Sequence, residues 1–262
     1  MRYGARPGVL AIAHRGGAGL GAENTMDAFA RSYALGLRYL ETDVRQSADG
    51  ELVVFHDARL DRVTDGRGPL SKATAADLRR LLVDGAHPIP TLADVLQNFP
   101  DAYFTIDLKD ESAGETLARV LIDTGSADRV CVAGAWDKSL RRLRELVGPD
   151  LNTALGWRDL ATLVACTHAR VRVPGPRFSG GFAHVPLRIG RLPVYGDRLI
   201  ARAREMGIAT IVWTVDDPDQ MQRLLDSGVD GIITDRPDLL REVLIARDQW
   251  TPPRHELEVT AV

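Results

Sequence analysis

Cysteine is scarce in this sequence, with two among 262 residues. Cys131 and Cys166 stand in apolar stretches and lack the close spacing of a redox motif or a zinc site. A disulfide scaffold and a cysteine zinc site are therefore excluded, and both residues are predicted to be buried free thiols. Thiols of this kind are typical of a reducing compartment, so we expect a cytoplasmic protein.

The sequence also has no long apolar run and no excess of charge of one sign. Its first apolar run, Val9–Ala13, ends at His14 and is too short for a signal sequence or a membrane span. The 33 basic and 36 acidic residues give a formal net charge of -3 without any block of like charge. We therefore expect no integral membrane association and no nucleic-acid partner, while a homo-oligomer stays open.

What the sequence does contain is an alternation of short apolar stretches of β-strand character with longer stretches of helical periodicity. Strands joined by helices pair in parallel through right-handed crossovers. Eight such units in a chain of this length predict an α/β fold, a closed (β/α)8 TIM barrel that forms one domain over residues 1–262. The predicted strands are Val9–Ala13, Tyr39–Val44, Tyr103–Leu108, Arg129–Ala133, Asn152–Gly156, Gly181–Val185, Ala209–Val215 and Gly231–Thr234.

Two features interrupt the simple alternation. A further strand-like run, Leu52–His56, follows the second predicted strand, and Asp49-Gly50 between them is a strong hairpin signal. With Asp49 and Gly50 as the two loop residues, His56 is expected to lie opposite Asp43. Residues 57–100 are too long for one crossover helix and are predicted to carry a small insertion over the barrel mouth, while residues 251–262 form a peripheral tail.

Chemistry is expected at the carboxyl ends of the strands, where barrel enzymes have their active sites. Near the end of the second predicted strand, Glu41 and Asp43 point to the same face because strand side chains alternate. Two buried carboxylates on one face repel each other unless a cation lies between them. We favour a metal ion, and the alternative is a pair of salt bridges to Arg15, Arg38 or Arg45.

Three other strand ends carry side chains of interest. On the third predicted strand Asp107 and Lys109 share a face, although Lys109 taken alone is as well explained as an ordinary strand-end lysine. The first strand ends in His14 and Arg15 before two glycines, a pattern suited to an anionic ligand. Trp213 ends the seventh strand and either lines a substrate pocket or packs in the core.

Together these residues comprise two histidines, three carboxylates, an arginine and a lysine. Such an oxygen-rich set suits Mg2+ or Ca2+, and no cluster of cysteine and histidine indicates zinc. Cleaving a phosphodiester requires neutralisation of the nonbridging oxygens, a base for the nucleophile and an acid for the leaving alkoxide. The metal with Arg15 and Lys109 would supply the first, and His14 and His56 the other two, in an order that the sequence leaves open.

Short motifs follow one another from residue 9 to about residue 245, and each is weak alone. Their order and spacing resemble the signature of the glycerophosphodiester phosphodiesterase family. The motifs are His14-Arg15-Gly16, Glu23-Asn24-Thr25, Glu41-x-Asp43, Val53-Val54-Phe55-His56-Asp57, Leu60-x-Arg62-x-Thr64, Gly66-x-Gly68, Pro90-Thr91-Leu92, Ile106-Asp107-Leu108-Lys109, Val212-Trp213-Thr214-Val215 and the run 228–237 that includes Thr234-Asp235-Arg236-Pro237.

The resemblance implies a barrel enzyme that hydrolyses glycerophosphodiesters to glycerol phosphate and an alcohol with Mg2+ or Ca2+. Asp107 departs from the glutamate usual in the family and reaches about one methylene less far. Trp136, in Gly134-Ala135-Trp136, stands where the family often has Ser-Phe, which changes the pocket wall. By motif position the metal ligands are Glu41, Asp43 and Asp107, the acid/base pair is His14 and His56, and the phosphate contacts are Arg15 and Lys109.

Two other functions fit the same fold. A lysophospholipase D-type phosphodiesterase would require a larger apolar mouth or a membrane-binding helix, and the sequence has no basic amphipathic segment. A non-catalytic phosphate-ligand binding barrel would lack one of the histidines or carboxylates, and here every position is filled. We therefore expect an enzyme that acts on a small-molecule phosphodiester.

Overall fold

The structure is a computed structural model that describes residues 2–5, 7–171, 178, 180–189, 192–194 and 196–252. From residue 253 onward, the predicted peripheral tail lies outside the described residues. Cys131 and Cys166 are both free, as predicted, and Cys131 is fully buried while Cys166 is half-buried.

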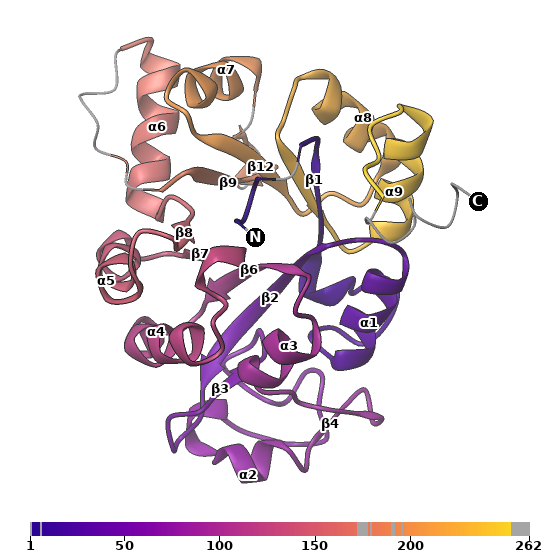
Figure 1. Ribbon diagram of the computed structural model, residues 1–262, viewed down its shortest axis with the longest axis vertical. Coiled ribbons are helices and arrows are strands. Elements are labelled where there is room, and N and C mark those ends of the chain that lie inside the picture. Colours follow the sequence, from indigo (N-terminus) through magenta and orange to yellow (C-terminus); the bar gives the residue numbers. More distant parts are fainter. Residues whose placement is uncertain are drawn as a thin grey trace.

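Eight parallel strands form the barrel, in the spatial order β8-β7-β6-β2-β1-β13-β12-β9 (Figure 1). The ring is closed between its two end strands by a parallel bridge from Ala154 to Phe182, and the amide of Leu155 donates to the carbonyl of Phe182 at 2.8 Å. The strands are β1 (Leu10–Ala13), β2 (Tyr39–Gln46), β6 (Tyr103–Leu108), β7 (Val130–Gly134), β8 (Asn152–Thr153), β9 (Phe182–Pro186), β12 (Ala209–Trp213) and β13 (Gly231–Thr234). All eight predicted strands are therefore present.

A helix follows every barrel strand and covers its outer face, as Figure 1 shows. Apolar side chains from one stripe of each helix pack on outward-facing strand residues such as Leu40, Val132 and Val212. The helices are α1 (Met26–Ala34), α3 (Leu92–Asn98), α4 (Gly114–Asp123), α5 (Asp137–Val147), α6 (Trp157–Ala169), α7 (Asp197–Glu205), α8 (Pro218–Asp226) and α9 (Pro237–Ala246). The predicted (β/α)8 TIM barrel is confirmed.

The hairpin after β2 is present, but its predicted register is wrong by one residue. Strand β3 (Leu52–Val54) pairs antiparallel with β2 so that Val54 lies opposite Val44. The amide of Phe55, and not that of His56, therefore donates to the carbonyl of Asp43 at 2.9 Å. The register differs because the loop contains three residues, 48–50, and not two. The amide of Ser47 donates to the carbonyl of Glu51 at 2.9 Å and so closes the loop. Gly50 adopts a left-handed conformation with a φ of +89°, as such loops require.

The stretch 57–100 contains two structurally different parts. Its last part is α3, whose Leu92, Val95 and Leu96 belong to the core of the barrel. The part before it extends from the barrel beside β3 at the foot of Figure 1 and has its own small apolar core around Leu60, Leu70 and Leu78. Its elements are η2 (Leu70–Lys72), α2 (Ala75–Leu78), β4 (Leu82–Val83) and β5 (His87–Pro88).

Aromatic rings close the end of the barrel where the strands begin. Tyr3, from the segment before β1, packs edge-on against Tyr39, Tyr103 and Phe182, each of which begins a strand, with ring centroids 5.1–6.3 Å apart. The hydroxyl groups of Tyr3 and Thr105 share a hydrogen bond of 2.6 Å. The opposite end, where the strands finish, is therefore the open one.

Short 3-10 turns and strands connect these parts. They are η1 (His14–Gly16), η3 (Glu111–Ala113), η4 (Ala127–Arg129), β10 (Arg188–Ile189) and β11 (Leu192–Pro193).

Candidate active site

A cavity of about 420 Å³ opens at the carboxyl ends of the barrel strands. Its lining includes every residue that the sequence singled out, although these residues come from five separate segments. They are His14, Arg15, Glu41, Asp43, His56, Asp107, Lys109 and Trp213. The structure therefore brings the whole predicted set to one place, as expected for a parallel barrel.

The turn after β1 has an unusual backbone that positions two of these side chains. Arg15 has a φ of +50° and is followed by Gly16 and Gly17, both left-handed. A Cβ on Gly16 would lie about 3.0 Å from the side chains of Ala28 and Phe29, so this close approach to α1 needs glycine. The turn directs the amide of Arg15 onto Glu41 Oε2 at 2.8 Å.

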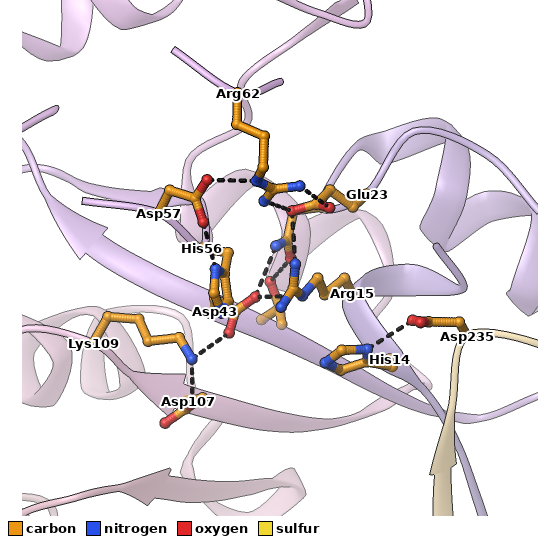
Figure 2. A network of polar contacts seen from close by, with 12 residues as sticks. His14, Arg15, Glu23, Asp43, His56, Asp57, Arg62, Asp107, Lys109 and Asp235 are labelled. Atoms are coloured by element: carbon orange, nitrogen blue, oxygen red, sulfur yellow. Dashed lines mark hydrogen bonds and ion pairs between the residues drawn. The ribbon is translucent and has the colours of Figure 1, made fainter. Parts of the chain in front are cut away.

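His14 is held by the carboxylate of Asp235, a residue to which the sequence assigned no role. Its Nδ1 lies 2.7 Å from Asp235 Oδ1, at the end of β13, and its Nε2 lies 3.9 Å from Glu41 Oε2 (Figure 2). Burial opposes the charged form of the imidazole, but Glu41 and Asp235 together raise the pKa of His14 above its ordinary value. With Nδ1 engaged by Asp235, Nε2 faces the other carboxylates.

Asp43 and Asp107 are neighbours in the parallel pairing of β2 with β6, and Lys109 lies between them. The Lys109 Nζ is 2.9 Å from Asp43 Oδ1 and 2.6 Å from Asp107 Oδ2. Burial alone would raise the pKa of Asp43, but Lys109 and Arg15 hold it below its ordinary value. The same two carboxylates outweigh burial and raise the pKa of Lys109.

Glu41 is the carboxylate without a strong cationic partner. It is 4% exposed, and its only ion pair among the described residues is the distant one with His14. Burial and the neighbouring Asp43 raise its pKa to about 8. A buried carboxyl group in this condition gains greatly from a nearby cation.

The alternative of salt bridges at the carboxylate pair is realised only in part. Arg15 Nε lies 3.4 Å from Asp43 Oδ2, yet it lacks the alignment of a hydrogen bond. Arg45 pairs with Asp110 at 2.6 Å, and Arg38 donates to the carbonyls of residues 33 and 37. Lys109, which the sequence left ambiguous, makes the closest ion pair with this carboxylate pair, at 2.9 Å from Asp43.

His56 reaches the cavity although the hairpin register differs from the prediction. The chain leaves the β2–β3 ladder after Val54, and the carbonyl of His56 accepts from Arg45 Nε at 2.8 Å. Its Nδ1 lies 2.7 Å from Asp57 Oδ1. Figure 2 shows the imidazole beside Asp43 and Lys109. Asp57 therefore holds the ring of His56 in place.

A group of polar residues that sequence analysis gave no role surrounds these side chains. Asn24 is buried, donates to Asp43 Oδ2 at 2.9 Å and accepts from Thr42 at 2.9 Å. Glu23 bonds to Arg15 and to Arg62, and Arg62 in turn bonds to Asp57, the partner of His56. Asp235 holds His14. All four lie inside the quoted motifs, so the motifs were the available signal.

The opposite wall of the cavity is largely apolar. It carries Trp136 and the half-exposed Trp157, with aliphatic side chains such as Leu155 and Leu160. His184, on β9, also lines the cavity, and burial lowers its pKa to about 4, so its imidazole is neutral. Trp213 lines the cavity as well and also packs against the core at the barrel axis, so it has features of both predicted positions.

Among the described residues, no group of three or more histidine, cysteine or acidic side chains is gathered tightly enough to hold a metal ion. Lys109 bonds to both Asp43 and Asp107, which explains why these carboxylates do not converge on a common point. The donor set nevertheless fits a hard divalent cation. It offers only carboxylate oxygens, and Glu41 is buried without a close cationic side chain.

Comparison with known proteins gives a consistent result. The Glycerophosphoryl diester phosphodiesterase family model matches residues 14–239. The Mycobacterium tuberculosis protein named "Probable glycerophosphodiester phosphodiesterase 2" is 35% identical, over 95% of this chain and 95% of that protein. A Caldanaerobacter subterraneus glycerophosphodiester phosphodiesterase is 30% identical, over 88% of this chain and 96% of that protein.

A solved structure agrees in fold. The crystal structure of a glycerophosphodiester phosphodiesterase from Thermotoga maritima superposes with a TM-score of 0.74 at 25% identity, covering 91% of this chain and 99% of that one. The predicted family, fold and enzyme class are thus confirmed. The chain belongs to the Glycerophosphoryl diester phosphodiesterase family.

Proposed function

We propose that this enzyme hydrolyses glycerophosphodiesters to glycerol phosphate and an alcohol by two-histidine acid/base catalysis. The observation that carries the proposal is that two imidazoles face one cavity, each with Nδ1 held by its own carboxylate. His14 is held by Asp235 and His56 by Asp57, so each presents Nε2 for proton transfer. Paired and separately held histidines are suited to an acid and a base.

The cations of the site complement the charge of a phosphodiester. Arg15 and Lys109 line the cavity, and in this proposal they bind the nonbridging oxygens of the substrate. Charge-assisted hydrogen bonds of this kind stabilise the extra negative charge of the transition state. One histidine then takes the proton of the attacking oxygen as it bonds to phosphorus, and the other gives a proton to the alkoxide as its bond to phosphorus breaks. The attacking oxygen belongs to water or to a neighbouring hydroxyl group of the substrate, and in the second case water then opens the resulting cyclic phosphate.

A divalent cation, Mg2+ or Ca2+, forms part of the proposal. The family depends on divalent cations in general, and Glu41, Asp43 and Asp107 are the residues that would hold the ion here. When bound, it would add positive charge at the phosphoryl oxygens. Binding would require the Lys109 ammonium group to move out from between Asp43 and Asp107. After this movement the ammonium group would be available to the phosphate.

One observation favours a second candidate, a lysophospholipase D-type activity on the same site. The apolar wall with Trp136, Trp157 and Leu160 offers a surface for a hydrocarbon substituent. Among the described residues no helix is both long and apolar enough to cross a membrane. The cytoplasmic location and a homo-oligomer stay predictions.

The test is a hydrolysis assay with several phosphodiesters and matched metal conditions. Glycerophosphocholine and glycerophosphoethanolamine should be cleaved to glycerol phosphate with Mg2+ or Ca2+, and EDTA should abolish turnover until metal is restored. Higher kcat/KM for lysophosphatidylcholine, lost on Trp136→Ala, would favour the second candidate. Full activity in EDTA, with no metal detected in the protein, would overturn the metal assignment.

A further inference from the structure

The insertion contributes one side chain to a polar network that reaches both the acid/base machinery and the phosphate-binding arginine. This side chain is Arg62, two residues after Leu60 of the insertion's apolar core (Figure 2). Its Nε donates to Asp57 Oδ2 at 2.5 Å, and its Nη1 and Nη2 donate to the two oxygens of Glu23 at 2.8 and 2.6 Å. All three groups of the guanidinium are therefore engaged.

One side of the network ends at His56. The carboxylate of Asp57 uses one oxygen for Arg62 and the other for His56 Nδ1, at 2.5 and 2.7 Å. A carboxylate fixed in this way determines which nitrogen of the imidazole carries the proton and how the ring is turned. Without Arg62, Asp57 would keep only its contact with His56, because among the described residues no other arginine or lysine pairs with it.

The other side ends at Arg15. Glu23 Oε1 accepts from both Arg62 Nη2 and Arg15 Nη1, at 2.6 and 2.9 Å. Figure 2 shows the resulting chain of contacts from Arg62 through Glu23 to Arg15 and then toward Asp43. Glu23 is therefore shared between an arginine of the insertion and an arginine that faces the cavity, and both limit its movement.

Stability alone gives a poor account of this arrangement. The Arg62 side chain is 47% exposed, and exposed ion pairs contribute little to folding, about 1 kcal/mol or less each. A bidentate arginine held by two carboxylates is instead a means of fixing geometry. The network also crosses from the insertion to the barrel, which joins two parts that have separate apolar cores.

We propose that Arg62 is a positioning residue for the proposed hydrolysis, acting through Asp57 on His56 and through Glu23 on Arg15. The inference rests on the proposed function of the same site. It also gives the insertion a role, which is to hold His56 and Arg15 in position. Arg62 itself does not need to touch the substrate.

The test uses Arg62→Ala and Arg62→Lys with Arg59→Ala as the matched control. Arg59 lies on the same insertion, and within the described part of the chain its side chain pairs only with Asp61. Its removal should therefore leave kcat and KM within about twofold of wild type. Arg62→Ala should lower kcat at least tenfold and raise KM severalfold. Arg62→Lys, which keeps the charge but not the fork, should recover only part of the loss.

Double-mutant cycles identify the route. In an Asp57→Asn background, Arg62→Ala should lower kcat by less than threefold, because its effect on His56 is already lost. In a Glu23→Gln background, its effect on KM should likewise shrink. An equal loss in all backgrounds, or a loss of kcat that follows the fraction of protein unfolded in urea, would overturn the inference.

A spectroscopic measurement separates this inference from the proposed function. Nitrogen chemical shifts of the His56 ring should show one tautomer in wild type and in Arg59→Ala, and a mixture in Arg62→Ala. A single unchanged tautomer in Arg62→Ala would count against the inference even if the enzyme is active. Absence of hydrolysis by the wild type with all phosphodiesters and metals would instead refute the proposed function and leave the tautomer result interpretable.

Discussion

The two ends of the barrel are built from the same strands in opposite ways. On β2 the inward-facing positions run from Tyr39 to Glu41 and Asp43, and on β6 they run from Tyr103 to Thr105 and Asp107. Of these inward-facing residues, the first on each strand is thus aromatic and the last is acidic. The period of two places all of them on one face, while the position along the strand decides which end each serves.

Packing at the closed end stabilises the fold, whereas the buried carboxylates at the open end destabilise it. Around Tyr3 the rings bury apolar area and pack edge-to-face, which favours folding. At the open end, Glu41 and Asp43 are buried with their charges only partly balanced, which opposes folding. The unfavourable free energy of burying the active-site carboxylates is thus confined to one end of the barrel, and aromatic packing at the other end offsets it.

The largest effect is expected from breaking the closed end. Tyr3→Ala removes a ring with three aromatic neighbours and should lower the free energy of unfolding by about 3 kcal/mol. Urea denaturation measures this change, and Tyr3→Phe is the control, which loses only the bond to Thr105 and about 1 kcal/mol. Turnover of the folded fraction should stay near wild type. A large drop in kcat would contradict the division between the two ends.

Breaking the open end should affect turnover and not folding. His14→Ala and His56→Ala should each lower kcat by about 100-fold or more, as for general acid–base groups, with unfolding midpoints close to wild type. A substrate with a p-nitrophenolate leaving group needs little protonation as it departs. It should therefore rescue the variant that lacks the acid, and this rescue assigns the two roles. Wild-type turnover in both variants would refute the mechanism.

A smaller effect is expected at Asp107, whose side chain is shorter than the family's glutamate. Asp107→Ala should weaken Mg2+ or Ca2+ binding at least tenfold, because it removes a proposed ligand, whereas Asp107→Glu should bind as well as wild type or better. Calorimetric titration of the metal-free protein gives both affinities. The assignment fails if the alanine variant binds metal with unchanged affinity.

The smallest effect is expected from removing the buried charge of Glu41 at the open end. The pKa of Glu41 is about 8 in the folded protein against an ordinary 4.5, so the metal-free fold binds the proton more tightly than the unfolded chain. Stability in EDTA should be greatest below pH 4.5 as far as this group is concerned, and should decline as the pH rises to about 8. Glu41→Gln should remove that decline and be more stable at pH 8 by about 1 kcal/mol or more. Equal pH dependence of the urea midpoints in both proteins would show that Glu41 pays no such cost.

The sequence by itself determined the barrel and most of the site. Alternating apolar stretches are local signals, so all eight strands were found, and the period of two placed Glu41 beside Asp43 on one face. The carboxyl-end rule then brought eight residues from separate segments to one cavity. These inferences succeeded because each depends on backbone geometry that neighbouring residues impose.

Tertiary structure alone decided the partners of those residues. The hairpin register shifted by one because Ser47 and Glu51 pair across a three-residue loop, and the sequence signal Asp49-Gly50 does not distinguish two loop residues from three. Asp235 meets His14 across 221 positions of sequence, and Arg62 meets Glu23 across 39. Hydrogen-bond partners so far apart have no local pattern, since their distance is fixed only when the barrel closes and the insertion packs on its rim.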